Sequence, residues 1–360
     1  MEKEGSVYIC HTYYHVFVAY LKELNKLERT IKSDIILSTM STDFESLADR
    51  IKASGVFNNI FFYDEKRESF FPEVAKIKEK KGNVITNMYY RIKFTRAFAE
   101  AQAQYVPVDL KQYEDVYVFC DADPIGYYLN RFKIHYHAVE DGLDTLKPLV
   151  QVKYDNRGFF WLKKFFSMNL NLIFMRDGYS KYCLDMEVND ISVIDDNFSK
   201  YKEVRRNDLI DNLSQDDRDI IIRTFVRDYD EFVKRLNAVD DTEESIMILT
   251  EPLCTLDVRE RLFKDLVETY SREGTVIIKP HPRDELDYYE LFPDLIVFDK
   301  AIPMEVFNFF EQGKIDKIIS VYTQLGSIKF AREKVFLGDD FMDKYEDPSV
   351  HRKREILDKK

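Results

Sequence analysis

The sequence contains few of the residues that build metal sites, disulfide scaffolds and nucleotide-binding loops. Only 4 of its 360 residues are cysteine and only 11 are glycine. The cysteines lie far apart and no CxxC pair occurs, so the sequence indicates neither a zinc site nor a disulfide framework. Isolated cysteines of this kind are typical of buried thiols in a reducing compartment, and we therefore expect a cytoplasmic protein.

Three further sequence signals are missing. There is no GxGxxG fingerprint and no GxxxxGK[ST] loop, which argues against dinucleotide-dependent oxidoreductases and P-loop enzymes. No run of eighteen uninterrupted apolar residues occurs, so we expect no transmembrane helix. The opening residues Met-Glu-Lys-Glu-Gly are not followed by the apolar stretch of a signal sequence.

What the sequence does contain is ample material for a packed interior. Hydrophobic residues make up 45% and aromatic residues 14% of the chain, a composition that argues against disorder. At 360 residues the chain exceeds the usual size of one hydrophobic core, so two domains are expected. The formal net charge of −12 argues against nonspecific nucleic-acid binding.

Strand-like and helix-like segments alternate along the chain, which predicts the α/β class with parallel sheets covered by helices. The expected strands are 7–10, 34–38, 60–63, 115–120, 134–139, 246–250, 275–278, 295–298, 317–321 and 335–337. The expected helices are 14–24, 44–53, 88–104, 258–270 and 304–310, with a helical pattern over 199–238 that is clearest at 215–236. We predict two domains, 1–198 and 245–345, with a helical linker region at 199–244 and a charged tail at 346–360.

One aromatic segment allows two interpretations. Residues 158–175 combine Phe, Trp and Leu with Lys163 and Lys164, and Arg157 precedes them. Such a run forms either a buried strand or helix between domains or an interfacial element on a membrane surface. A peripheral contact of Phe159 to Phe166 with the inner face of the plasma membrane therefore stays open.

The most informative stretch is residues 275–284, Thr-Val-Ile-Ile-Lys-Pro-His-Pro-Arg-Asp. Proline fixes φ and lacks a backbone donor, so Pro280 and Pro282 end the strand and fix the direction in which His281 leaves it. Parallel sheets bind ligands just beyond the carboxyl ends of their strands. An imidazole beside Lys279 and Arg283 at such a place predicts an anion site, with phosphate as the expected anion.

Three other motifs follow expected strands. Glu140-Asp141-Gly142 places two carboxylates at a strand end, where one can act as a general base. Glu305 lies near a helix start and could accept hydrogen bonds from ribose hydroxyls. Ser320 to Ser327 follow another strand and offer hydroxyl and backbone N–H donors for a phosphate. Taken singly, an acidic turn, a favourable helix dipole and a helix cap explain these motifs equally well.

In this order the motifs resemble those of bacterial sialyltransferases. An acidic-acidic-Gly motif, a Lys-x-His-Pro-Arg motif, a Pro-x-Glu and a Ser/Thr motif are shared by glycosyltransferase families 38, 52 and 80. The chain length is most similar to that of family 52, which contains lipooligosaccharide and capsule sialyltransferases. The resemblance implies a GT-B-type fold of two Rossmann-like domains facing a central cleft, the acceptor-side domain first and the nucleotide-sugar-binding domain second. It also implies inverting, metal-independent transfer of sialic acid from CMP-sialic acid to a hydroxyl of a surface glycan, without a cofactor.

The resemblance assigns roles to individual residues. Glu140 would be the general base, and His281 would be the general acid or charge stabiliser at the departing phosphate. The residues expected to contact the nucleotide are Lys279, Pro282, Glu305, Ser320, Thr323 and Gln324. The residues expected on the acceptor side are Asp141, Gly142, His11, Tyr13 and His15.

Several alternatives stay open. Asp257 or Glu251 could be the base instead of Glu140, because some family 52 enzymes place a catalytic Asp in about this region. Asp121-Ala-Asp123 has the spelling of a metal-binding DxD motif, but the resemblance makes it a loop, and no metal is expected. A transferase that uses a UDP-hexose and a catalytically silent glycan-assembly protein are alternative functions. A homodimer is compatible with the resemblance, since some relatives dimerise.

Overall fold

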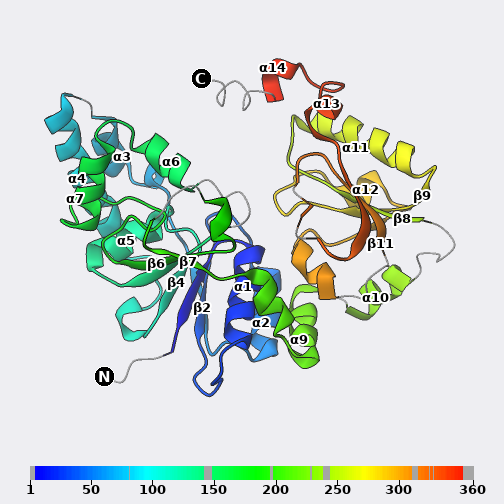
Figure 1. Ribbon diagram of the computed structural model, residues 1–360, viewed down its shortest axis with the longest axis horizontal. Helices are drawn as coiled ribbons and strands as arrows, with labels where there is room; N and C mark the ends of the chain where they lie inside the picture. Colours follow the sequence, from blue (N-terminus) through cyan, green and yellow to red (C-terminus); the bar gives the residue numbers. More distant parts are fainter. Residues whose placement is uncertain are drawn as a thin grey trace. The chain divides into compact units, whose positions relative to one another are not determined.

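A computed structural model describes residues 5–80, 82–141, 148–194, 198–227, 229–237, 244–309, 315–323, 325–326 and 328–351. Two of the predicted site residues, Gly142 and Gln324, lie outside these described residues. The chain divides into two compact units, Met1–Asp217 (unit 1) and Arg218–Lys360 (unit 2), each with its own sheet (Figure 1). The division falls inside the segment expected to form a helical linker region, 199–244.

Unit 1 contains a seven-stranded sheet in which each neighbouring pair of strands is parallel, in the order β3-β2-β1-β4-β5-β6-β7. Its strands are β1 Val7–Cys10, β2 Asp34–Ser38, β3 Ile60–Tyr63, β4 Val116–Val118, β5 Tyr136–Val139, β6 Cys183–Val188 and β7 Tyr201–Glu203. Its helices are α1 Tyr13–Leu24, α2 Glu45–Ser54, α3 Pro72–Glu79, α4 Val84–Gln102, α5 Pro124–Phe132, α6 Pro148–Asp155, α7 Phe160–Met168 and α8 Arg206–Asp211, with short 3₁₀ turns η1 Glu68–Phe70, η2 Leu110–Gln112 and η4 Ile191–Val193.

Unit 2 contains a five-stranded parallel sheet in the order β10-β9-β8-β11-β12. Its strands are β8 Glu244–Leu249, β9 Gly274–Lys279, β10 Ile296–Val297, β11 Ile315–Ser320 and β12 Ala331–Phe336. The remaining helices are α9 Gln215–Phe225, which spans the division between the units, α10 Tyr229–Asn237, α11 Leu256–Tyr270, α12 Tyr288–Leu291, α13 Gly338–Met342 and α14 Pro348–His351, with the 3₁₀ helix η5 Met304–Phe309.

The central strands form because their side chains are apolar on both faces. Every residue of β1 is buried, as are five of the six residues of β8, which is the pattern of strands covered by helices on both sides. The core of unit 1 gathers around Ile9, Val118 and Ala138, and that of unit 2 around Ile248 and Ile278. Burial of these strands fixes their register and hence the positions of the residues that follow them.

Both sheets reverse their strand order at one point. In unit 1 the reversal lies between β1 and β4, and in unit 2 it lies between β8 and β11. Chains leave the carboxyl ends of adjacent parallel strands in opposite directions at such a point, which opens a crevice for a ligand. His11, Asp123 and Glu251 follow β1, β4 and β8, which flank these reversals, and Ser320 is the last residue of β11.

The α/β alternation predicted from the sequence is confirmed, and β1, β2 and β3 have the predicted bounds. Two strands were not predicted. β6 was missed because Asp185 and Glu187 interrupt its apolar pattern. In the structure these carboxylates are paired, Glu187 with Lys22 at 2.6 Å and Asp185 with His137 at 2.8 Å. The expectation of helices alone over 199–238 is wrong at β7, a three-residue edge strand, and the pattern at 215–236 forms two helices, α9 and α10.

The aromatic segment 158–175 contains α7, which packs on the core of unit 1 with one side and exposes apolar side chains on the other, so the helix is only half buried in unit 1. The helix predicted at 304–310 is the 3₁₀ helix η5. None of the described helices is both long and apolar enough to cross a bilayer.

Candidate active site

The loop after β9 holds His281 in a defined orientation. β9 ends at Lys279, directly before Pro280, as the two prolines predict. The backbone N–H of His281 donates to the Thr250 hydroxyl at 3.0 Å, and its Nδ1 accepts the backbone N–H of Arg283 at 3.1 Å. Because Nδ1 is an acceptor, the neutral imidazole carries its proton on Nε2. The ring therefore offers one N–H donor and no second proton.

The electrostatics of this loop keep His281 neutral. Burial lowers the pKa of His281, and the neighbouring charges of Arg283 and Lys279 lower it further, to about 4. An anion placed against Nε2 would counter the two cations and raise that pKa. In the free protein His281 is therefore a neutral hydrogen-bond donor that an anionic group can convert toward a proton donor.

We expect ¹⁵N-resolved NMR of the free protein to show His281 as the neutral Nε2–H tautomer from pH 5 to 8. Its folded pKa of about 4 lies below the reference value of 6.5, so the unfolded state binds the extra proton between these values. The contribution of His281 to the free energy of unfolding therefore increases as the pH rises from about 4 to 6.5. An imidazolium signal from His281 at pH 6 would contradict this electrostatic account.

A buried ion pair stabilises the loop after β9. Arg259 Nη1 lies 2.7 Å from Asp284 Oδ1, and both residues are buried. Asp284 Oδ2 also accepts the hydroxyls of Thr250 at 3.0 Å and Tyr288 at 2.8 Å. The same Thr250 hydroxyl accepts the N–H of His281, so the ion pair sets the position of the imidazole through one intermediate side chain. The sequence interpretation did not identify these residues as part of the site.

Lys279 is buried beneath this loop, and Glu305 nearby is partly buried. Lys279 is 3% exposed, and its Nζ donates to the carbonyls of Pro280 at 2.8 Å and Lys300 at 3.3 Å. Burial lowers the pKa of Lys279 to about 7, against the opposing charges of Asp299 and Glu305. Burial also raises the pKa of Glu305. Lys279 thus holds the loop together, while Pro282 is exposed beside His281.

The loop after β11 is organised by Glu251, which follows β8. Glu251 is 5% exposed and accepts the backbone N–H groups of Val321 at 3.2 Å, Tyr322 at 3.0 Å and Thr323 at 2.9 Å. The Ser320 hydroxyl lies 3.1 Å from the same carboxylate. The backbone donors expected to hold a phosphate are therefore engaged by a carboxylate in this structure. Thr323 keeps a partly exposed side chain on the loop.

The surroundings of Glu251 and Asp257, the alternative candidates for the base, indicate a structural role for each. Glu251 has both carboxylate oxygens occupied by the loop after β11, which leaves it a structural role. Asp257 is exposed in the first turn of α11, where its hydrogen bond to Thr255 lowers its pKa. A carboxylate at a helix start interacts favourably with the helix dipole, which explains Asp257 without catalysis.

In unit 1 the two carboxylates of the acidic motif have different surroundings. Glu140 is 2% exposed, and its Oε2 accepts the backbone N–H of Asn189 at 2.6 Å. Burial raises the pKa of Glu140. Asp141 has 47% of its side chain exposed and is hydrogen-bonded to His15 Nε2. Asp141 is therefore the member of the pair that a second molecule can reach.

His15 is the fixed support of Asp141. It is completely buried, stacks on Phe119 at 4.8 Å between ring centroids, and its Nδ1 accepts the backbone N–H of His11 at 3.0 Å. Burial lowers the pKa of His15 although Asp141 opposes the shift. A neutral ring that accepts at Nδ1 donates from Nε2, so His15 donates to the Asp141 carboxylate.

His11 belongs to a second buried network at the same sheet edge. It is 3% exposed, and its Nε2 lies 2.8 Å from Glu65 and 3.5 Å from Asp123. Burial lowers the pKa of His11, but Glu65, Asp123 and Asp141 outweigh burial, so the net pKa is raised. Glu65 also accepts the Ser38 hydroxyl at 2.7 Å. Because both His11 and His15 are buried, neither presents an open ring face to a sugar as expected of an acceptor wall.

A hollow of about 680 Å³ opens in unit 1 beyond the carboxyl ends of β2 and β3. Residues 39–45, Phe62 and Asp64 line it. Tyr13 touches one of these residues, since its hydroxyl donates to the carbonyl of Asp43 at 2.6 Å. Hydroxyls, the carboxylates of Asp43, Glu45 and Asp64 and the exposed ring of Phe62 are groups that suit a sugar. The sequence interpretation missed this loop because it carries no motif.

The Asp121-Ala-Asp123 segment forms a turn between β4 and α5, as expected for a loop. Asp121 is buried and accepts the Tyr136 hydroxyl at 2.9 Å and the backbone N–H of Asp177 at 2.8 Å. Asp123 lies near His11 instead. The two carboxylates therefore have separate partners and structural roles.

Comparison with known proteins places the chain in a family. Residues 54–335 match glycosyltransferase family 52, and the chain belongs to that family. It is a glycosyltransferase of the GT-B fold type. A galactoside α-2,3-sialyltransferase from the luminous marine bacterium Photobacterium phosphoreum has a similar fold, with a TM-score of 0.53, 11% identity, and coverage of 93% of this chain and 91% of that one.

Two other matches are more limited. A sialyltransferase from Photobacterium damsela aligns with a TM-score of 0.45 and 13% identity, covering 93% of this chain and 74% of that one. An uncharacterised protein of Haemophilus influenzae is 31% identical over 97 residues. That match spans 26% of this chain and 31% of the length of the relative.

Proposed function

We propose that the protein transfers sialic acid from CMP-sialic acid to a hydroxyl of a bacterial surface glycan, of the lipooligosaccharide or capsule type. The observation that carries the proposal is the family 52 match over residues 54–335, within which lie both the acidic motif and the His-Pro loop. The likeness in fold to a galactoside sialyltransferase supports a galactoside as the probe acceptor. Four free cysteines support a cytoplasmic location for the reaction.

In the proposed reaction Asp141 is the general base. The acceptor hydroxyl gives its proton to Asp141 as its oxygen bonds to the anomeric carbon of sialic acid. The bond from that carbon to the CMP phosphate breaks, and its electron pair stays on the phosphate oxygen. His281 Nε2–H stabilises this developing charge, so a single displacement inverts the anomeric centre without a metal.

The assignment of the base to Glu140 stays a prediction beside this one. The exposures of the two side chains favour Asp141, at 47%, over Glu140, at 2%. Glu140 then supports its neighbour by holding the chain after β6 through Asn189. Thr323, Pro282 and Glu305 are proposed to bind the nucleotide beside His281.

A thermal-shift panel with CMP, UDP and GDP in the presence of EDTA tests the donor. We expect CMP to raise the melting temperature selectively, because a ligand that binds only the folded state stabilises it. A shift with UDP alone would replace the proposal by a hexosyltransferase. A flat response to all three nucleotides, together with no turnover of CMP-sialic acid, would favour a catalytically silent assembly protein.

A further inference from the structure

The helix α7, Phe160–Met168, carries apolar side chains on two faces. Only one of these faces packs against the core of unit 1. Phe160, Phe166 and Met168 pack against the core of unit 1. On the outer side Trp161 is 73%, Leu162 44% and Phe165 48% exposed. Exposed apolar groups that gather in this way mark an interaction surface.

The outer surface continues beyond both ends of the helix. Phe159, just before α7, is 64% exposed, and Leu170, just after it, is 47% exposed. These two residues with Trp161, Leu162 and Phe165 are called the α7 patch. Positions 161, 162 and 165 lie on one side of a helix, so the patch forms a stripe rather than scattered single residues.

The surroundings of the α7 patch are basic in a chain whose net charge is −12. Between residues 152 and 175 the charged side chains are Lys153, Arg157, Lys163 and Lys164 against Asp155, a local charge of 4 − 1 = +3. Lys153 and Arg157 are exposed. Asp155 lies 3.0 Å from Arg176, which also lies 3.4 Å from Asp177.

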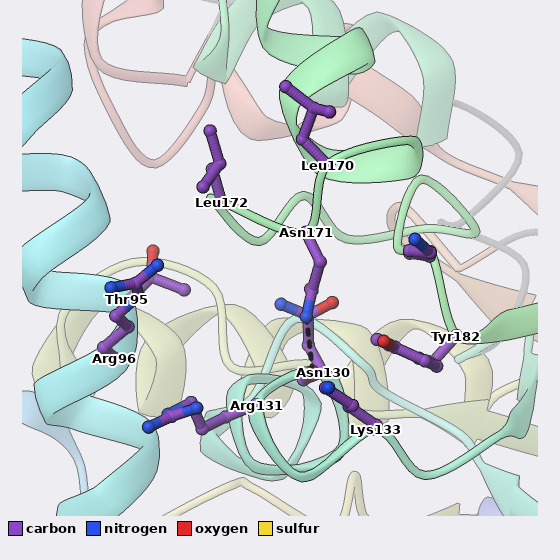
Figure 2. Close-up of a pocket in the computed structure, with 10 residues that line it drawn as sticks. Thr95, Arg96, Asn130, Arg131, Lys133, Leu170, Asn171, Leu172 and Tyr182 are labelled. Carbon is purple, nitrogen blue, oxygen red and sulfur yellow. Dashed lines mark hydrogen bonds between the residues drawn. The ribbon is translucent and has the colours of Figure 1, made fainter.

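A basic pocket of about 290 Å³ adjoins the end of the patch. Figure 2 shows Arg96, Arg131 and Lys133 on its lower side and Leu170 and Leu172 on its upper side. Lys181 also lines it. Glu100 pairs with one of these four cationic side chains, Arg131, at 2.7 Å. The four cations together still exceed this one carboxylate in charge. Leu170 belongs both to the pocket and to the α7 patch, so the apolar and basic surfaces are continuous.

We propose that this face of unit 1 binds the surface of a bilayer containing anionic phospholipid. The aromatic and aliphatic side chains of the α7 patch lie at the boundary between headgroups and acyl chains, and the cations of the basic pocket face lipid phosphates. A second copy of this chain fits the surface less well. A symmetric contact would bring two basic pockets and two basic rims together, and like charges repel.

Within unit 1 the basic pocket lies at the other edge of the sheet from the candidate active-site residues of that unit. Arg131 and Lys133 precede β5, and Lys181 precedes β6, so the basic pocket lies at the amino ends of these strands. His11 and Asp141 follow the carboxyl ends of β1 and β5. Docking on lipid therefore leaves the carboxyl edge of the sheet open to substrates. The inference does not depend on the identity of the donor sugar.

Trp161 is the single tryptophan of the chain, so its fluorescence reports directly on the patch. We expect vesicles of equal parts phosphatidylglycerol and phosphatidylcholine to sediment the full-length protein, shift its emission to the blue and, when the acyl chains are brominated, quench it. Vesicles of phosphatidylcholine alone should bind at least tenfold more weakly. Glycerol 3-phosphate in solution should not reproduce the emission shift, which separates a bilayer from free phosphate as the ligand.

Matched variants assign the binding to this face. Phe165→Ser should weaken vesicle binding about tenfold, as expected for loss of a phenyl group at the interface. Phe336→Ser, in unit 2 and with a similar exposure of 51%, should leave vesicle binding unchanged. The double variant Arg131→Gln with Lys133→Gln should weaken binding about fivefold per cation and reduce its salt dependence. Circular dichroism melting checks that each variant is folded.

Three results would overturn the proposal. The first is that vesicles containing phosphatidylglycerol do not sediment the protein. The second is that the Phe165→Ser and Phe336→Ser variants bind these vesicles equally well. The third is that the emission shifts to the blue as protein concentration rises in the absence of lipid. The last result, with a dimer in analytical ultracentrifugation, would assign the α7 patch to a second copy of the chain.

Discussion

Asp141→Asn is expected to lower kcat for sialyl transfer from CMP-sialic acid to lactose by about 10²- to 10⁴-fold, the usual contribution of a general base. The asparagine keeps an oxygen that can accept the N–H of His15, so the loop after β5 should keep its position. What is lost is the group that takes the proton of the acceptor hydroxyl. The donor KM should change little, because the proposed role of Asp141 concerns the acceptor.

Glu140→Gln is the matched comparison for Asp141→Asn. The Gln oxygen can still accept the N–H of Asn189, and the side chain is buried, so we expect a smaller loss of kcat than for Asp141→Asn. His15→Gln should fall between the two, because it removes only the support of Asp141. If Glu140→Gln abolished transfer while Asp141→Asn retained it, the base would be Glu140, as the resemblance to the sialyltransferases implies.

His281→Ala is expected to lower kcat at saturating donor by about 10²- to 10³-fold. This is the usual effect of removing one preorganised donor from a developing negative charge. The loss should appear in the chemical step, measured by single-turnover release of CMP, and not only in the affinity for CMP. A variant with weakened CMP binding and an unchanged single-turnover rate would make His281 a binding residue only.

Thr250→Val tests how much the position of His281 contributes to kcat, apart from the presence of its imidazole. It removes the hydroxyl that accepts the His281 N–H and donates to Asp284, but leaves the imidazole in place. We expect a smaller loss of kcat than for His281→Ala and a return of the His281 pKa toward its ordinary value as the loop loosens. An unchanged kcat and NMR titration of His281 would contradict the role given to Thr250.

The sequence predicted the strands other than β6 and β7, and the position of the His-Pro loop, because these depend on local chemistry. Pro280 and Pro282 must end β9, and buried apolar runs such as Ile246 to Leu249 must form central strands. The partners of Thr250 and Glu251 could not be predicted in this way. They depend on β8 lying between β9 and β11, and strand order is not encoded in any one segment.

Strand order also decides which carboxylate of the acidic motif is exposed, so the sequence could not predict it. Successive side chains leave a strand end on opposite sides, so the sequence shows that Glu140 and Asp141 differ but not which one is exposed. The position of β6, which supplies Asn189 after its end, decides this, and β6 was itself missed because Asp185 and Glu187 interrupt its apolar pattern. His11 and His15 likewise have the residue types of a sugar-binding wall, yet the buried partners Glu65 and Phe119 draw them into the interior.

The central claim is tested most directly by turnover of the donor. Purified protein is incubated with lactose and either CMP-sialic acid or UDP-hexoses, with EDTA present, and the released nucleotide and the glycan product are measured. We predict release of CMP with formation of sialyl-lactose, and a rate about 10²- to 10³-fold lower in His281→Ala. Transfer from a UDP-hexose without any release of CMP would contradict the account.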